Sequence, residues 1–188
     1  MTLFTEHSYS RVMVFIDYRN IYESVKVLGD DLRLDLYRLT QILVSSRDLV
    51  GAYVFDARKR IPSSNDQTLA MHDRLRDQGF RVIARESIVL RTEGNAEQKE
   101  VDVSMACEML EHALLDHYDV AIVVSGDRDF VPAIQRVQAA GKRVEVAALE
   151  SAYNDECKRA ADVYYIIDKL PIMSMSSPND DLGVKYDE

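Results

Sequence analysis

The chain has 188 residues, of which 47% are hydrophobic, and this is the length and apolar content of one ordinary domain with a single core. Its 32 acidic and 23 basic residues give a formal net charge of −9. That charge argues against a protein that holds nucleic acid by bulk electrostatic attraction, so specific DNA binding is not expected. The two cysteines lack CxxC spacing, no apolar run approaches the roughly 20 residues of a membrane-spanning helix, and the first residues lack a signal peptide's apolar stretch. The sequence therefore predicts a cytoplasmic domain with no membrane association.

In its first half the chain alternates strand patterns with helix patterns. The continuous apolar run at residues 12–16 is typical of a central strand covered on both faces, and it ends at Asp17. Asp35 is placed to cap a helix that has apolar side chains at i, i+3 and i+4 spacings. The expected strands are 12–16, 49–55 and 80–84, and the expected helices are 21–28, one that begins after Asp35, and 69–77. Residues 91–95 are polar and predict a surface loop.

The second half continues the alternation. Helices are expected at 101–115, 131–140 and 154–161, and strands at 118–124, 143–147 and 163–167. This order predicts a three-layer α/β fold, with a mostly parallel central sheet flanked by helices and connected by right-handed crossovers. From residue 171 onward Ser, Asn, Asp and Gly dominate, so residues 1–170 are expected to form the domain and residues 171–188 a flexible acidic tail.

Aspartates follow two of the expected strands at the point where each strand ends. Asp17 closes the strand 12–16, while Asp127 and Asp129 follow the strand 118–124 in a Ser-Gly-Asp-Arg-Asp-Phe turn. In an open parallel sheet, functional groups collect beyond the carboxyl ends of the strands, so these carboxylates converge if the two strands are neighbours. Asp102, at the start of a helix, is a further contributor.

Each of these aspartates also has an ordinary structural interpretation. Asp17 and Asp127 could cap the helices that follow them, Asp129 could be a solvated first-turn acid, and Asp102 could complement a helix dipole. Metal binding is favoured because like charges a few ångströms apart repel unless a cation lies between them. Hard oxygen ligands predict Mg²⁺ or Mn²⁺ rather than zinc, and no histidine or cysteine cluster competes for that role. The four histidines are interpreted as ordinary surface or helix-end residues.

Three segments of the chain resemble the signatures of NYN domains, and in particular those of the LabA-like branch. They are Phe15-Ile16-Asp17-Tyr18-Arg19-Asn20, Lys99-Glu100-Val101-Asp102-Val103 and Ser125-Gly126-Asp127-Arg128-Asp129-Phe130, and the resemblance spans about residues 10 to 168. It implies a PIN-like, Rossmann-like fold and a metal-dependent ribonuclease that acts on RNA. A homodimer is a further expectation at the level of the family.

The resemblance also implies roles for single residues. Carried over by position, the catalytic and metal-binding residues are Asp17, Asp102, Asp127 and Asp129. Asn20 would orient a metal-bound water or a phosphate, and Ser125 would support the turn by hydrogen bonding. Arg19, Arg128 and Lys99 are candidates for binding RNA phosphates, against the alternative that they are solvated surface charges. Asp162 is expected to be structural.

The sequence departs from the family at two places. Tyr18 and Arg19 put bulky groups where relatives often have a small residue, so they either contact RNA or pack and restrict access. Glu108 stands where relatives often have another aspartate, but it lies about 240° round an ideal helix from Asp102, so the two need not share a face.

Two other functions remain open at this stage. One is a catalytically weak or inactive member of the same fold, which binds RNA or a protein partner. The other is a Mg²⁺-dependent phosphatase, although the turn at Asp17 lacks the Asp-x-Asp spacing of an aspartyl-phosphate enzyme and no GxxxxGK[ST] phosphate loop is present.

Overall fold

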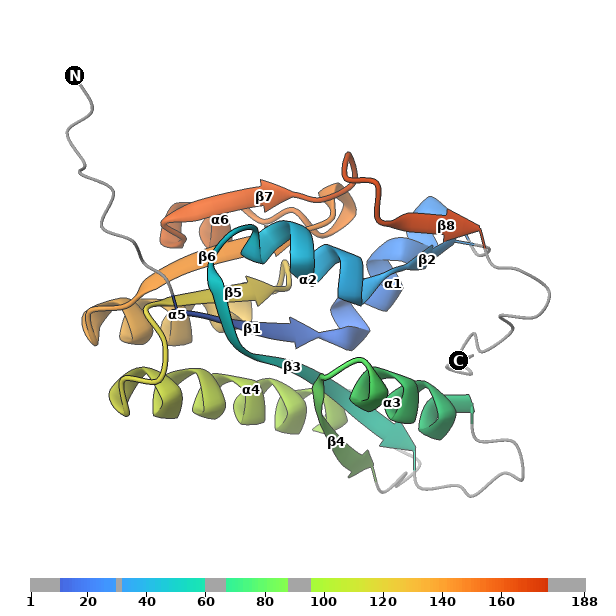
Figure 1. The fold of residues 1–188 in the computed structure, drawn as a ribbon, viewed down its shortest axis with the longest axis horizontal. Helices are drawn as coiled ribbons and strands as arrows, with labels where there is room; N and C mark the ends of the chain where they lie inside the picture. The colour runs from blue at the N-terminus through green and yellow to red at the C-terminus, as the bar shows by residue number, and fades with distance from the viewer. Residues whose placement is uncertain (1–10, 30–31, 60–66, 88–95, 176–188) are drawn as a thin grey trace.

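The computed structural model describes residues 11–29, 32–59, 67–87 and 96–175, and Figure 1 shows how they are arranged. The main sheet consists of β1 (Arg11–Asp17), β3 (Asp48–Lys59), β4 (Arg81–Ser87), β5 (Val120–Val124), β6 (Arg143–Ala148) and β7 (Val163–Ile166). The helices are α1 (Tyr18–Leu28), α2 (Leu36–Val44), α3 (Gln67–Asp77), α4 (Ala96–Leu114), α5 (Val131–Ala139) and α6 (Asp155–Ala160), with 3₁₀ turns η1 (Arg128–Phe130) and η2 (Glu150–Ala152). The predicted parallel α/β fold is therefore confirmed.

The order of the strands places β1 and β5 side by side in the middle of the sheet. The order is β4-β3-β1-β5-β6-β7, and every neighbouring pair runs parallel. After β1 the chain builds the half that holds β3 and β4, and from β5 it builds the other half, so the strand order reverses between β1 and β5. Ile16 is paired with Val124, which brings Asp17 next to the turn that follows β5. Ligand sites of open α/β sheets lie at such a reversal.

Successive residues of β1 pack into two different cores because the side chains of a strand alternate between its faces. Val12, Val14 and Ile16 lie in the core beneath α1, α2 and α3. Met13 and Phe15 lie in the core beneath α4 and α5, and Figure 1 shows α4 running along that side of the sheet. Burial on both faces explains why the sequence of β1 is a continuous apolar run.

The structure contains a small second sheet that the sequence did not predict. β2 (Leu32–Leu34) pairs antiparallel with β8 (Met173–Met175), and neither strand was predicted. The prediction of a tail from residue 171 is wrong for residues 171–175, because Ile172 is buried in the core and β8 is paired. Residues 176–188 and the predicted loop at 91–95 lie outside the described residues. In the part of the chain that is described, no helix is long and apolar enough to cross a membrane.

Candidate functional site

Asp17 lies at the carboxyl end of β1 with only 2% of its surface exposed. One carboxylate oxygen accepts a hydrogen bond from the backbone N–H of Asn20, at 3.1 Å, and thereby caps α1. The other accepts from the hydroxyl of Ser125, also at 3.1 Å. The cap explains why α1 begins at Tyr18 rather than at residue 21. Asp17 is therefore both a helix cap and a fixed charge at the switch point.

The turn after β5 is tied to the end of β1 by further hydrogen bonds. The backbone N–H of Asp127 donates to Ser125 Oγ at 3.2 Å, and the backbone N–H of Gly126 donates to Asn20 Oδ1 at 3.0 Å. Asp127 in turn caps η1, because its Oδ1 accepts from the N–H of Asp129 at 2.9 Å. Asp127 is half-buried and Asp129 is exposed, so the acids run from the floor of the site to its rim.

Asp102, on α4, faces the same group of aspartates. Burial, followed by the charges of Asp17, Asp127 and Asp129, raises the pKa of Asp102 to about 7, while Arg19 acts to lower that pKa. Burial is also the main cause that raises the pKa of Asp17 to about 6, to which the charge of Asp127 adds. Asp102 Oδ1 is buried and has no hydrogen-bond partner among the described residues. Four carboxylates from three separate segments thus act on one another electrostatically.

The residues expected to bind substrate differ in the contacts that their side chains make. The side chains of Asn20 and Ser125 are hydrogen-bonded within the protein, where they hold the two strand ends together. Arg128 forms an exposed ion pair with Glu156, at 3.8 Å. Lys99 lies within α4, but its side chain is outside the part of the chain that the structure describes.

Three other expectations can be compared with the structure. Tyr18 packs against the core beneath α1 and stacks on Tyr22, with the ring centroids 6.3 Å apart. Glu108 points to His112, with 3.4 Å between Oε2 and Nε2, which agrees with its lying on another face of α4 than Asp102. Asp162 is structural, because its carboxylate accepts from the N–H of Val144 at 2.7 Å.

Sequence reasoning missed a buried pair next to this site. Asp56, in β3, is 0% exposed, and its Oδ2 lies 2.8 Å from Nε2 of His72 on α3, which is 1% exposed. The interpretation of His72 as a surface or helix-end residue is therefore wrong. Asp56 lies at the same edge of the sheet, and its charge also raises the pKa of Asp17. The signal was available, because Asp56 directly follows an apolar run, as Asp17 does.

The chemistry of the four aspartates fits a hard divalent cation, since their donors are all oxygen atoms. The unpartnered Oδ1 of Asp102 is a buried acceptor that a cation would satisfy. As the side chains are placed, however, the described residues include no group of three or more His, Cys, Asp or Glu that could hold a metal ion. A cation held by three or more of these carboxylates would require side chains of this site to rotate towards it.

A parallel three-layer α/β domain with aspartates at its switch point has the architecture of the PIN-like class. The model of the NYN domain family matches residues 11–170. The chain therefore belongs to the NYN domain family. It is also similar in structure to a protein of unknown function from Vibrio parahaemolyticus, whose crystal structure superposes with a TM-score of 0.71 over 88% of this chain and 98% of that one, at 23% identity. No curated protein matches the sequence.

The raised pKa of Asp102 predicts how the stability of the metal-free protein depends on pH. Its pKa rises from 3.8 to about 7 on folding, so between about pH 4 and 7 the folded state holds a proton that the unfolded chain has released. The contribution of Asp102 to the unfolding free energy should therefore fall as the pH rises through this window. In EDTA, Asp102→Asn should raise the melting temperature at pH 7.5 and change it little at pH 4.

An exposed aspartate on α3 offers the matched control for that experiment. Asp77→Asn should leave the pH profile of melting unchanged, because Asp77 is exposed. A wild-type melting temperature that stays flat or increases between pH 4 and 7, with Asp102→Asn indistinguishable from wild type, would contradict the electrostatic description of the site.

Proposed function

We propose that this protein is a ribonuclease of the LabA-like branch, which cleaves RNA phosphodiester bonds with the help of Mg²⁺ or Mn²⁺. The observation that carries the proposal is the gathering of four aspartates from β1, α4 and the turn after β5 at the switch point of the sheet, where Asp102 Oδ1 is buried and finds no partner among the described residues. A protein that had no use for this cluster would carry its electrostatic cost without compensation. The NYN family is in general nuclease-like, which supports the same conclusion.

Under this proposal the residues that hold the ion are Asp17, Asp102, Asp127 and Asp129. A bound Mg²⁺ or Mn²⁺ would supply positive charge to the phosphate and a bound water with a lowered pKa. Asp17 is kept in place by Asn20 and Ser125, which fixes one carboxylate of the set before an ion arrives. Because the pKa of Asp102 is raised to about 7 in the metal-free protein, protons compete with the cation, and metal binding should strengthen as the pH rises.

A second candidate function is favoured by one specific observation. The described residues contain no ready-made group of three or more metal-binding side chains, as expected of a catalytically inactive NYN domain that binds RNA or a protein partner. In that case the aspartates would remain only as caps and hydrogen-bond acceptors, which is a role that Asp17 and Asp127 fulfil in any case.

Cleavage of short labelled RNAs, combined with calorimetric titration of Mg²⁺ and Mn²⁺, separates the two candidates. A ribonuclease should bind the ions and cut RNA, and it should leave DNA of the same sequence intact. Its cleavage of RNA should cease in EDTA. The absence of both a binding heat at millimolar metal and any cleavage would favour the inactive domain. Turnover of small phosphate esters with no effect on RNA would instead indicate a phosphatase.

Location and assembly are further parts of the proposal. We place the protein in the reducing cytoplasm, which is consistent with its two cysteines being free thiols, Cys107 exposed and Cys157 buried. We also propose a homodimer, which sedimentation of the purified protein would test directly.

A further inference from the structure

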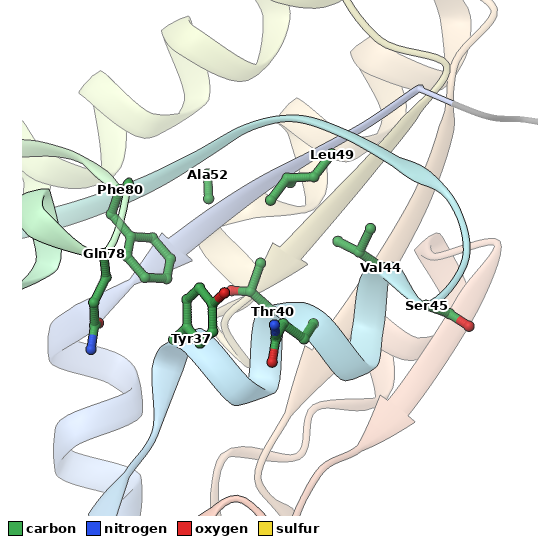
Figure 2. Close-up of a pocket in the computed structure, with 10 residues that line it drawn as sticks. Tyr37, Thr40, Val44, Ser45, Leu49, Ala52, Gln78 and Phe80 are labelled. Atoms are coloured by element: carbon green, nitrogen blue, oxygen red, sulfur yellow. The ribbon is translucent and has the colours of Figure 1, made fainter.

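A cavity lies away from the acidic site, between α2, the start of β3 and the turn that joins α3 to β4 (Figure 2). Its volume is about 320 Å³, at the lower end of the roughly 300–1,000 Å³ of small-molecule sites. Ala52, in the first half of β3, and Phe80, just before β4, line it. The aspartates lie beyond the opposite ends of the strands, so this cavity is separate from the proposed catalytic site.

The lining of the cavity combines buried apolar residues with exposed apolar, aromatic and amide side chains. Ala52 and Phe80 are buried, and the half-exposed ring of Tyr37 stands at the mouth. The amide side chains of Gln41 and Gln78 complete the rim. All ten lining residues, which belong to the described part of the chain, are uncharged. A ligand with a buried net charge would find nothing to compensate it there, so the occupant must be neutral.

Thr40 provides a second and independent indication of a ligand. Its side chain lines the cavity and is only 3% exposed, and its Oγ1 has no hydrogen-bond partner within the described structure. Figure 2 shows that Thr40 and Tyr37 project from α2 towards β3 and Phe80. Buried hydroxyls are normally hydrogen-bonded, and one that is left without a partner costs stability. A polar atom of a ligand in the cavity would satisfy it.

We infer that this cavity binds an uncharged heteroaromatic ring of the nucleobase class. Flat rings of this kind stack on aromatic side chains, and the exposed ring of Tyr37 offers such a face, while the buried Phe80 belongs to the apolar floor. Their edges carry both donors and acceptors, and these match the Thr40 hydroxyl and the amides of Gln41 and Gln78. No metal takes part, so the inference stands independently of the proposed ribonuclease activity. The ring can come from a free nucleoside or from a base within a single-stranded RNA.

Binding is tested on the full chain in EDTA, so that the acidic site cannot respond to metal. The four ribonucleosides and a short single-stranded RNA are titrated separately, and the backbone amide resonances of the protein are followed by NMR. At least one nucleoside should shift resonances of Thr40, Gln41 and residues 78–80. A shift by RNA together with none by any nucleoside, at equal base concentration, would assign the site to bases within RNA. If none of the probes shifted these amide resonances at millimolar concentration, the inference would be overturned.

Thr40→Val separates a ligand site from a packing defect. The change removes the hydroxyl and keeps the volume, so it should raise the melting temperature, by about 2–4 °C, and weaken binding at least tenfold. Ala52→Ile, which fills the floor, should also weaken binding. Thr68→Val, on α3, makes the same chemical change elsewhere and should leave the affinity unaltered. Equal affinity of Thr40→Val and wild type for the nucleosides and the RNA would reject the site.

Discussion

Gly126→Ala should unfold at a markedly lower temperature than the wild type and should lose cleavage of RNA. A Cβ atom at Gly126 would lie 1.9 Å from the carbonyl oxygen of Ala152 and 2.8 Å from its carbonyl carbon. These are backbone atoms that cannot rotate away, so either the turn or η2 must shift. Overpacking of this kind costs about 1–3 kcal/mol, which corresponds to a fall of roughly 2–4 °C in melting temperature for each kcal/mol in a domain of this size.

The effect should extend to the acidic site because Gly126 lies between Ser125 and Asp127. The Ser125 hydroxyl holds Asp17, and the Gly126 N–H is bonded to Asn20, so moving the turn loosens both links between β1 and β5. Gly29→Ala is the matched control. The atom nearest to the new Cβ of this variant is Leu32 Cδ1 at 3.5 Å, which is an ordinary contact. The Gly29→Ala protein should therefore behave like the wild type. Equal melting temperatures and activities of the two glycine variants would refute this steric account.

Asp56→Ala should cost about 3–5 kcal/mol of unfolding free energy, the usual result of removing one member of a buried pair. Oδ2 of Asp56 and Nε2 of His72 are 2.8 Å apart and both side chains are buried, so truncation leaves the imidazole without its acceptor. A double-mutant cycle with His72→Ala measures the coupling, which we expect to reach at least roughly 1 kcal/mol.

The same helix supplies a control with equal geometry and different burial. Arg76 and Asp73 on α3 are also 2.8 Å apart, but both side chains are exposed. Asp73→Ala should cost less than about 1 kcal/mol, because exposed ion pairs contribute little. If denaturant unfolding gave similar losses for Asp56→Ala and Asp73→Ala, burial would not be what makes the Asp56–His72 pair important.

The sequence predicted the features of this protein that depend on local pattern. β1 and β5 were recognisable as central strands because both are continuous apolar runs, and their shared direction made Asp17 and the turn after β5 neighbours. A helix cap at Asp35 was predicted in the same way, and its side chain accepts from the N–H of Arg38 at 2.9 Å. In each case the signal and its cause lie within a few residues of each other.

The features that were missed depend on distant parts of the chain. β2 and β8 are three residues each, too short for a periodic pattern, and they form only because the chain returns after β7. His72 has no local feature that indicates burial. Its position follows from the packing of α3 over Asp56. The hydrogen bond from the N–H of Gly126 to the side-chain oxygen of Asn20, 106 residues away, was also not predicted.

The charge of Asp127 provides the most direct test of the proposed ribonuclease site. Asp127→Asn keeps an oxygen that can cap η1 through the N–H of Asp129, so the fold should be preserved while a metal-binding charge is lost. Asp155→Asn, on α6, is the control, because its oxygen can still accept from Tyr153.

Mn²⁺-dependent cleavage of a labelled RNA is the measurement that decides. Losing a residue that only hydrogen-bonds to a metal ligand costs roughly 10–100-fold in affinity or activity. Because Asp127 is proposed to bind the metal directly, Asp127→Asn should reduce the rate of cleavage by more than about 100-fold. Asp155→Asn should leave the rate unchanged. Neither variant should melt below the wild type, because both keep the hydrogen bonds of the side chain that is changed. Undiminished cleavage by purified Asp127→Asn would contradict the proposal that these aspartates form the catalytic site.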